Sequence, residues 1–255
     1  MRGRNLKYRL LIGVVIALFF VIKRCSQQEV NPYTGRTQTI SMSPENEIAI
    51  GLQSAPQMAE QYGGLHPNNQ YQALVDNVGS KLVNSSIARE TPYKYEFHLL
   101  NDQNTINAYA LPGGQIFITY ALFSKLENED QLAGILGHEI GHVLGRHSAE
   151  RIAESEYWQG LTTAGAVGAD MGGLISGIGQ NTLLTNGRSD ELESDDLGVK
   201  FMIKAGYNPR EMIGVMEILK AATGPNRVPE FQSTHPDPDN RIEKIEEAIE
   251  KYKNQ

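Results

Sequence analysis

The sequence predicts an α+β protein that is mostly helical and contains one small β-sheet. Three observations support this prediction. Residues 128–147 have the apolar spacing of a helix, and residues 93–119 contain three short strand-like runs separated by turns. Most other segments after residue 43 show helical spacing between glycine- and proline-containing turns. Consecutive strands with helices before and after them are typical of the α+β class.

The composition is that of a globular protein with its own core. The chain has 255 residues, 40% hydrophobic residues and a formal net charge of −7. A chain of this length holds one sizeable domain or two small ones. The acidic charge and the lack of a basic stripe in the sequence argue against nucleic acid as a partner. The single cysteine, Cys25, rules out an internal disulfide.

The first 24 residues have the composition of a membrane signal. Leu10 to Ile22 is an apolar run of 13 residues with basic residues on both sides. A usual membrane span needs about 20 apolar residues, but Arg9 and Lys23 can snorkel to the interfaces and extend the run. The alternative is a cleaved signal peptide, whose apolar core has about 7–15 residues. No small-x-small cleavage site follows the run, which favours an uncleaved anchor.

We therefore expect two regions along the chain, a single N-terminal transmembrane helix over residues 1–28 and a second region over residues 29–255. Because basic residues favour the N-terminal side of the apolar run, the N-terminus is expected to be cytoplasmic. The second region would then lie on the extracytoplasmic, periplasmic side of the membrane.

Two helices and three strands are expected next. Capping and turn residues delimit helices over 43–61 and 69–88. Strands are predicted at 93–100, 107–111 and 115–119, with a Pro-Gly-Gly turn before the last one. Together the strands would form a small sheet.

The second half of the chain is predicted to be helical apart from one unusual segment. Helices are expected over 148–158, 189–204 and 209–222, and a charged amphipathic helix over 241–253. Residues 159–187 contain eight glycines. We interpret this segment as a mobile flap or a loosely packed helical pair, with a membrane-touching segment as a third alternative.

The segment His138-Glu139-Ile140-Gly141-His142 has the pattern H-E-x-x-H. Each residue of an α-helix turns about 100°, so His138 and His142 lie about 40° apart on one face, one turn from each other. Two imidazoles in this arrangement can bind one zinc ion, and Glu139 can act as general base on the water that zinc activates. An ordinary amphipathic helix with two surface histidines is the alternative for so short a motif.

The residues around the motif favour the zinc interpretation. Asn128 is a good N-cap, and Gln131 can complete a capping box. Four glycines recur on one face beside the histidines: Gly134, Gly137, Gly141 and Gly145. Each interior glycine costs roughly 1 kcal/mol relative to alanine, so their shared face predicts another backbone packed very close to it.

A catalytic zinc ion takes three protein ligands and keeps one position open, so a third ligand is needed. A histidine in the pattern H-E-x-x-H-x-x-G-x-x-H would fall at position 148, but the chain has Ser148 there. His147 misses this position by one and, on a continuing helix, would lie about 180° from His138, on the apolar side. We interpret His147 as a packing or capping histidine.

Glu191 is the better candidate for the third ligand. It lies on a separate predicted helix with Asp195 four residues later on the same face. One of these carboxylates can bind zinc while the other holds a ligand histidine in place. Glu193 competes for the ligand role but lies about 160° round the helix from Glu191. A solvated acidic helix face is the alternative interpretation of these charges.

These motifs resemble those of the HtpX/BepA-type family of zinc metallopeptidases, a gluzincin group. His138-Glu139-x-x-His142 together with Glu191-x-x-x-Asp195 is similar to the family's metal-binding pattern. Further similar stretches are Asn31-Pro32-x-Thr34-Gly35-Arg36, Asn107-Ala108-Tyr109-Ala110-Leu111-Pro112-Gly113-Gly114, and Ser233-Thr234-His235-Pro236 with Arg241. The resemblance covers about residues 31–250, which is far more specific than H-E-x-x-H alone.

The resemblance implies a zincin-like α+β fold with one zinc ion per chain, bound by His138, His142 and Glu191, and with Glu139 as base. It also implies an endopeptidase that acts on protein or peptide substrates in quality control of membrane or envelope proteins. The alternative function is a membrane-anchored chaperone or scaffold with a latent metal site. The intact Glu139 argues against this alternative, because scaffolding needs no base. The sequence does not indicate an oligomeric state.

Two further parts of the site are predicted. An edge strand beside the metal can bind an extended peptide, which points to Asn107, Ala108, Tyr109 and Ala110, with ordinary sheet structure as the alternative. His235 lies in a proline-stiffened loop, and the family's Ser-Thr-His-Pro stretch implies a histidine near the zinc. There it could donate a hydrogen bond to the developing oxyanion or occupy the open zinc position, and a loop-bracing role is the alternative.

Overall fold

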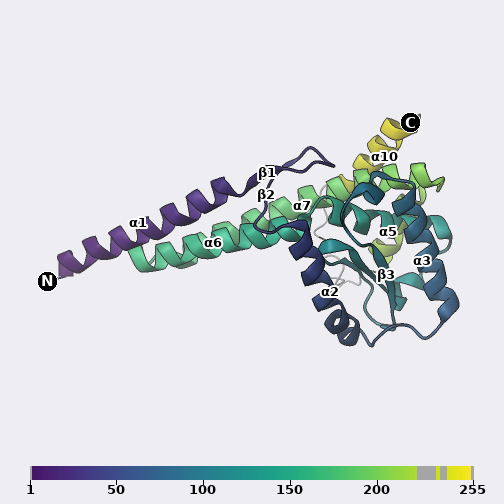
Figure 1. Ribbon diagram of the computed structural model, residues 1–255, viewed down its shortest axis with the longest axis horizontal. Coiled ribbons are helices and arrows are strands. Elements are labelled where there is room, and N and C mark those ends of the chain that lie inside the picture. Colours follow the sequence, from purple (N-terminus) through teal and green to yellow (C-terminus); the bar gives the residue numbers. More distant parts are fainter. Residues whose placement is uncertain (1, 223–233, 236–239, 254–255) are drawn as a thin grey trace. The chain divides into compact units, whose positions relative to one another are not determined.

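The computed structural model describes residues 2–222, 234–235 and 240–253, and the chain forms two compact units (Figure 1). The first unit consists of Met1–Ser43 and Ser148–Gly187. The second consists of Pro44–His147 and Arg188–Gln255 and contains the H-E-x-x-H segment. The expected boundary between an anchor and a second region at residue 28 stays a prediction.

The second unit contains a sheet formed by β3 (Glu96–Leu100), β4 (Ala108–Ala110) and β5 (Gln115–Thr119). The strand order is β3-β5-β4, with β3 parallel and β4 antiparallel to β5. Every residue of β5 is buried, as expected for a central strand. All three predicted strands are confirmed. The first begins at Glu96 instead of residue 93, because the N–H of Lys94 donates to the carbonyl of Gly113 and not to a neighbouring strand.

Helices of the second unit pack on this sheet and carry the predicted motifs. They are α2 (Pro44–Gln61), α3 (Asn69–Asn84), α4 (Tyr120–Phe123), α5 (Glu129–Leu144), α8 (Glu211–Ala221) and α10 (Arg241–Tyr252), with 3-10 helices η1 (Ile87–Glu90) and η2 (Pro112–Gly114). α3 packs on β3 and α5, while α5 also packs on β4, β5 and α8. The predicted helix over 69–88 ends early, because the Ser86 hydroxyl accepts a hydrogen bond from the N–H of Ala88 and starts η1.

Helix α5 begins where the sequence predicts, with a modified capping box. Asn128 Oδ1 accepts a hydrogen bond from the N–H of Gln131 at 2.9 Å. The Gln131 side chain returns a bond to the N–H of Glu127, at 2.8 Å, instead of to that of Asn128. Both interactions satisfy backbone donors that a helix start leaves free, so they stabilise the first turn of the helix that carries the motif.

The glycine face of α5 meets other helices at very short range, as predicted. A Cβ at Gly137 would lie 3.3 Å from the Cα of Gly198, and one at Gly141 would lie 2.9 Å from the Cα of Ser194. Both partners belong to helix α7 (Gly172–Ala205). A Cβ at Gly134 would lie 3.5 Å from the Cα of Met212 in α8. Gly145 differs, because its neighbour is the imidazole ring of His147 and not a backbone.

The first unit consists of packed helices and a short hairpin. α1 (Arg2–Ser26) lies beside α6 (His147–Ala169), and β1 (Gln28–Val30) pairs antiparallel with β2 (Thr37–Thr39) (Figure 1). The first part of α7 packs back on α6, where a Cβ at Gly172 would lie 2.9 Å from the Cβ of Ala166. Residues 159–187 are therefore helical and paired, as in one of the predicted alternatives, and the helices predicted on either side of them are parts of α6 and α7.

The expected transmembrane helix is not found. In the part of the chain that the structure describes, no helix combines the length and the apolar character needed to cross a bilayer. Helix α1 does form, but its apolar run is only 13 residues long. The basic residues that were expected to snorkel instead form ion pairs in the first unit, Lys23 with Glu156 and Arg9 with Asp170.

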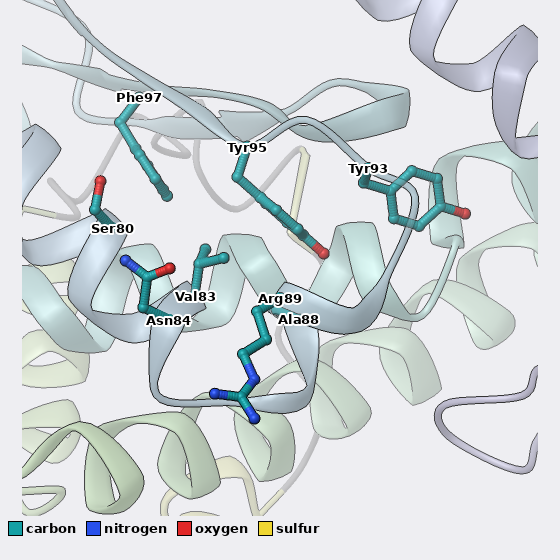
Figure 2. Close-up of a pocket in the computed structure, with 8 residues that line it drawn as sticks. All are labelled: Ser80, Val83, Asn84, Ala88, Arg89, Tyr93, Tyr95 and Phe97. Carbon is teal, nitrogen blue, oxygen red and sulfur yellow. The ribbon is translucent and has the colours of Figure 1, made fainter.

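A pocket of about 250 Å³ lies between α3, η1 and the segment that leads into β3 (Figure 2). Its lining residues are Ser80, Val83, Asn84, Ala88, Arg89, Tyr93, Tyr95 and Phe97. None of the predicted site residues lines this pocket, so we do not assign the predicted chemistry to it.

We expect Gly141→Ala to lower the free energy of unfolding by about 1–3 kcal/mol, because the new methyl group would overlap the α7 backbone. The matched control is Gly177→Ala, also in a helix, where no atom of the described residues lies within 4 Å of the added Cβ. That change should raise the free energy of unfolding by about 0.5–1 kcal/mol through the better helix propensity of alanine. Urea denaturation measures both, and equal effects would contradict the close helix crossing.

Candidate metal centre

The structure brings the predicted ligands together on two helices. His138 and His142 lie on α5, one turn apart as predicted, with their Nε2 atoms 3.0 Å from each other. Glu191 lies on α7, with Oε2 at 3.3 Å from His138 Nε2 and Oε1 at 3.3 Å from His142 Nε2. Both histidines and the glutamate are nearly or fully buried, so they form an enclosed group.

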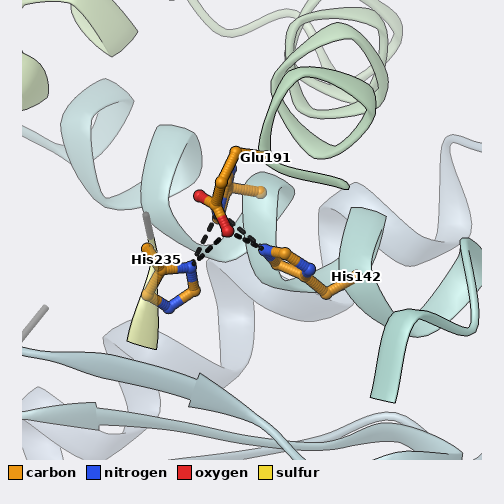
Figure 3. A group of neighbouring side chains, drawn as sticks. His142, Glu191 and His235 are labelled. Carbon is orange, nitrogen blue, oxygen red and sulfur yellow. Dashed lines mark hydrogen bonds and ion pairs between the residues drawn. The ribbon is translucent and has the colours of Figure 1, made fainter. Parts of the chain in front are cut away.

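His235 joins this group from a distant part of the chain. Its Nδ1 lies 3.1 Å from Glu191 Oε1 and 3.4 Å from His138 Nε2. Figure 3 shows the Glu191 carboxylate between the rings of His142 and His235. One donor atom from each of the four residues lies within 4.8 Å of all the others. We call His138, His142, Glu191 and His235 the four-donor cluster.

The spacing of the donor atoms suits a tetrahedral metal ion. With zinc–ligand bonds of about 2.0–2.1 Å, two ligand atoms of a tetrahedral site are roughly 3.3 Å apart. Five contacts between donor atoms of the four-donor cluster are 3.0–3.4 Å long, and all four residues offer donor atoms within 4.8 Å of one another. Glu191 Oε2 is buried and has no hydrogen-bond partner among the described residues. Three imidazoles and a carboxylate directed at one point form a donor set of the kind that zinc prefers.

Buried charges set the protonation of the cluster. Burial lowers the pKa of His138, but its hydrogen bonds to Asp195 and Glu191 outweigh burial and raise that pKa to about 10. Burial lowers the pKa of His142 well below its usual range. Burial raises the pKa of Glu191, but the nearby His235 and His142 outweigh it and hold that pKa well below its usual range.

Asp195 and Arg241 stand directly behind the cluster. Asp195 Oδ1 accepts a hydrogen bond from His138 Nδ1 at 2.8 Å, which leaves His138 Nε2 facing the cluster. Arg241 donates to Asp195 from Nε at 2.7 Å, and its Nη2 lies 3.4 Å from Glu191 Oε2. Burial raises the pKa of Asp195, but the Arg241 guanidinium outweighs it and holds that pKa below its usual range.

This role of Arg241 was not predicted from the sequence, which indicated only that the residue begins a charged amphipathic helix. Arg241 is only 6% exposed. Its partner Asp195 lies 46 residues earlier, so no local spacing could indicate the pair. The only signal was the match between Arg241 and the family pattern. Asn240, with φ of 65°, turns the chain into α10 just before Arg241.

Glu139 lies on α5 beside the cluster and is only 1% exposed. Neither carboxylate oxygen has a hydrogen-bond partner among the described residues, and the nearest base is His235, with Nε2 at 3.6 Å. Burial raises the pKa of Glu139, although His235 and His138 oppose the increase. A buried carboxylate with free lone pairs and a raised pKa is suited to accept a proton near neutral pH.

The predicted substrate strand lies next to His235. His235 Nε2 is 3.4 Å from the carbonyl oxygen of Ala108, and Asn107 Nδ2 donates to the hydroxyl of Thr234 at 3.3 Å. The Tyr109 side chain, however, packs in a buried apolar cluster with Tyr62, Leu100 and Phe117. β4 is an outer strand of the three-stranded sheet, and its role in binding an extended peptide stays a prediction.

His147 and Glu193 lie outside the four-donor cluster, as expected. His147 is not on the apolar side of a continuing helix, however, and that expectation is wrong. α5 ends at Leu144, and Arg146 has a left-handed backbone with φ of 57°, so the chain turns before His147. His147 Nδ1 consequently lies 2.8 Å from His142 Nδ1, and its Nε2 lies 2.8 Å from Glu193 Oε2.

Comparison with known proteins decides the family. Residues 69–249 match the family described as Peptidase family M48. The chain belongs to peptidase family M48. The matched segment contains every residue of the four-donor cluster as well as Glu139, Asp195 and Arg241. The resemblance stated from the sequence motifs is therefore confirmed, and this M48 protein is a metallopeptidase of a zinc-dependent family.

Relatives of this M48 peptidase occur in fungi and bacteria. The mitochondrial metalloendopeptidase OMA1 of Schizosaccharomyces pombe is 29% identical over 257 residues, which cover 96% of this chain and 73% of that protein. The beta-barrel assembly-enhancing protease of Yersinia pestis is 29% identical over 231 residues, 84% of this chain and 46% of that protein. That of Escherichia coli (strain K12) is 31% identical over 182 residues, 66% of this chain and 37% of that protein. The chain spans less than half the length of these two bacterial relatives.

Proposed function

We propose that this protein is a zinc-dependent endopeptidase that cleaves peptide bonds in membrane or envelope proteins. The observation that carries the proposal is the four-donor cluster beside the buried carboxylate of Glu139, whose oxygens have no hydrogen-bond partner among the described residues. One zinc ion per chain would be held by His138, His142 and Glu191, as three protein ligands with an open fourth position require. The family match supports the same assignment.

Bound zinc supplies a Lewis acid, which acidifies a water molecule and polarises the carbonyl under attack. Glu139 takes the proton from the attacking water and passes it to the leaving amine. Its raised pKa matches this task, because the group must accept a proton and then release it near neutral pH. Asp195 holds His138 through its Nδ1, and Arg241 keeps Asp195 ionised and in place.

The β4 edge supports an extended peptide as the substrate. β4 is an outer strand of the three-stranded order, and its residue Ala108 lies beside His235. A peptide added along this strand through the backbone of residues 107–110 would have its scissile bond close to the cluster. Main-chain recognition of this kind depends little on side chains, which suits substrates of varied sequence.

Two observations support an association of this protein and its substrates with membranes. Some relatives are named for mitochondria and others for β-barrel assembly. Helix α1 also exposes many large apolar side chains, among them Leu11, Phe19 and Ile22. Contiguous exposed apolar surface marks contact with a membrane or another protein. We propose that α1 attaches the protein to a membrane through these exposed apolar side chains.

Cleavage of an unfolded protein such as casein should require both the metal and the base. We expect a chelator and Glu191→Gln each to abolish cleavage and to remove zinc, because a neutral amide is a poor ligand. Glu139→Gln should keep zinc but lose activity, since only the base is removed. The matched control is Glu217→Gln, an exposed position on α8. Zinc-loaded wild-type protein without any cleavage would instead favour the scaffold alternative.

His235 is proposed to close the fourth metal position in a resting state, because its Nδ1 lies among the other donor atoms. We then expect His235→Ala to raise the cleavage rate, with one zinc ion still bound. Steady-state cleavage of a quenched fluorescent peptide, with zinc content measured in parallel, tests this role. A fall in kcat of roughly 10²–10³ at unchanged zinc content would mean that His235 stabilises the developing oxyanion instead.

Membrane attachment through α1 predicts that the full-length protein stays in the membrane pellet after carbonate extraction. A variant with Val14→Arg and Phe19→Arg, two exposed apolar positions of α1, should be released, because charged groups are costly in the bilayer. Recovery of wild-type protein in the soluble fraction would contradict attachment. So would a soluble wild-type form that lacks residues 1–24.

A further inference from the structure

A chain of three buried or half-buried side chains runs behind His142. His142 Nδ1 lies 2.8 Å from His147 Nδ1, and His147 Nε2 lies 2.8 Å from Glu193 Oε2. The two imidazole rings meet edge to face, with centroids 4.9 Å apart and an interplanar angle of 83°. His147 is only 4% exposed. The Nδ1 atom of His138, the other predicted histidine ligand, contacts the Asp195 carboxylate, whereas the Nδ1 atom of His142 contacts the His147 ring.

We propose that His147 is the positioning residue for His142 and holds it in the tautomer that presents Nε2 to the metal. A carboxylate only accepts hydrogen bonds, so His147 Nε2, facing Glu193, carries a proton. We place the proton between the two Nδ1 atoms on His142, so that His147 Nδ1 accepts the hydrogen bond of 2.8 Å. His142 Nε2 is left bare and faces Glu191 and His138.

Two neighbouring groups agree with this arrangement of protons. Asp190 Oδ1 lies 3.8 Å from His147 Nε2, which places a second carboxylate on the protonated side of the ring. The hydroxyl of Ser194 lies 3.3 Å from His147 Nδ1, where it can donate to an acceptor nitrogen. The two carboxylates thus favour a proton on His147 Nε2, and the Ser194 hydroxyl is compatible with a lone pair on Nδ1.

The backbone between α5 and α6 places the His147 ring against His142. Arg146 adopts a left-handed conformation that costs energy for a residue other than glycine, and a hydrogen bond of 2.8 Å from its Nε to the buried Glu47 holds it there. A side chain at Gly145 would overlap the His147 ring, with a Cβ only 2.6 Å from Cε1. The turn and the glycine together fold His147 back onto the helix that carries the motif.

The same residues could also be interpreted as a second metal site, because donor atoms of His147, Asp190 and Glu193 lie within 4.8 Å of one another. The 2.8 Å contact to Glu193 is already a hydrogen bond, and His142 occupies the other nitrogen. We therefore assign the group to the support of His142, and the metal stoichiometry of the protein tests that choice.

The experiment measures the zinc affinity of the full chain by competition with a chelator, and it rests on the zinc site of the proposed function. His147→Phe keeps a ring of similar shape without polar atoms, and His147→Asn keeps an acceptor near the Nδ1 position. We expect His147→Phe to weaken zinc binding by about 10–100-fold, the usual effect of removing a group behind a ligand. His147→Asn should remain close to wild type. In nitrogen-15 spectra, the Nδ1–H signal of His142 should be protected in wild type and lost in the phenylalanine variant.

Equal zinc affinity in wild type and His147→Phe would overturn the inference while leaving the zinc site intact. Two zinc ions in wild type and one in His147→Phe would show a second metal site instead. Wild-type protein that binds no zinc would overturn the proposed function itself. If His147→Phe does not fold, Gly145→Ala displaces the ring without removing a polar group and should weaken zinc binding, with Gly177→Ala as the unaffected control.

Discussion

The close crossing of α5 and α7 is the contact on which the metal centre depends. Gly137 meets Gly198 and Gly141 meets Ser194 at distances that leave no room for a side chain. Helix axes can approach this closely only where small residues face one another, and interior glycines carry a cost in helix propensity. Because the two helices are so close, the Glu191 carboxylate of α7, about one turn from Ser194, reaches the imidazoles of His138 and His142 on α5.

Charges of alternating sign surround the cluster, and each predicted ligand is held by a different partner. Asp195 supports His138, and Arg241 neutralises Asp195 while also approaching Glu191. Taking such groups out of water is expensive, and removing one partner of a buried ion pair typically costs about 3–5 kcal/mol. The groups behind the ligands therefore behave as one network, whose geometry is kept by the cost of breaking any part of it.

Glu139 differs from Asp195 and Glu191, because neither of its carboxylate oxygens has a hydrogen-bond partner among the described residues. It is as buried as the other carboxylates, yet its oxygens make no hydrogen bond among the described residues. A protein interior rarely leaves a polar group in this state without a functional reason. The Glu139 carboxylate lies beside the four-donor cluster, where it could bind a reacting water molecule. The raised pKa of Glu139 favours the exchange of a proton with that water.

The sequence by itself determined the features that depend on local spacing. These are the start of α5, the shared face of His138 and His142, the glycine face and the orientation of Glu191 relative to Glu193. Caps and helical periodicity act over a few residues, so they can be read without knowing the fold. Only the tertiary structure decided the parts that depend on distant segments. Arg241 meets Asp195 across 46 residues, and His235 meets His138 across 97. The left-handed turn at Arg146 ends the helix before His147, so the position calculated for His147 on a continuing helix was wrong. Arg146 is held by Glu47, 99 residues earlier in the chain, and local spacing could not indicate this contact.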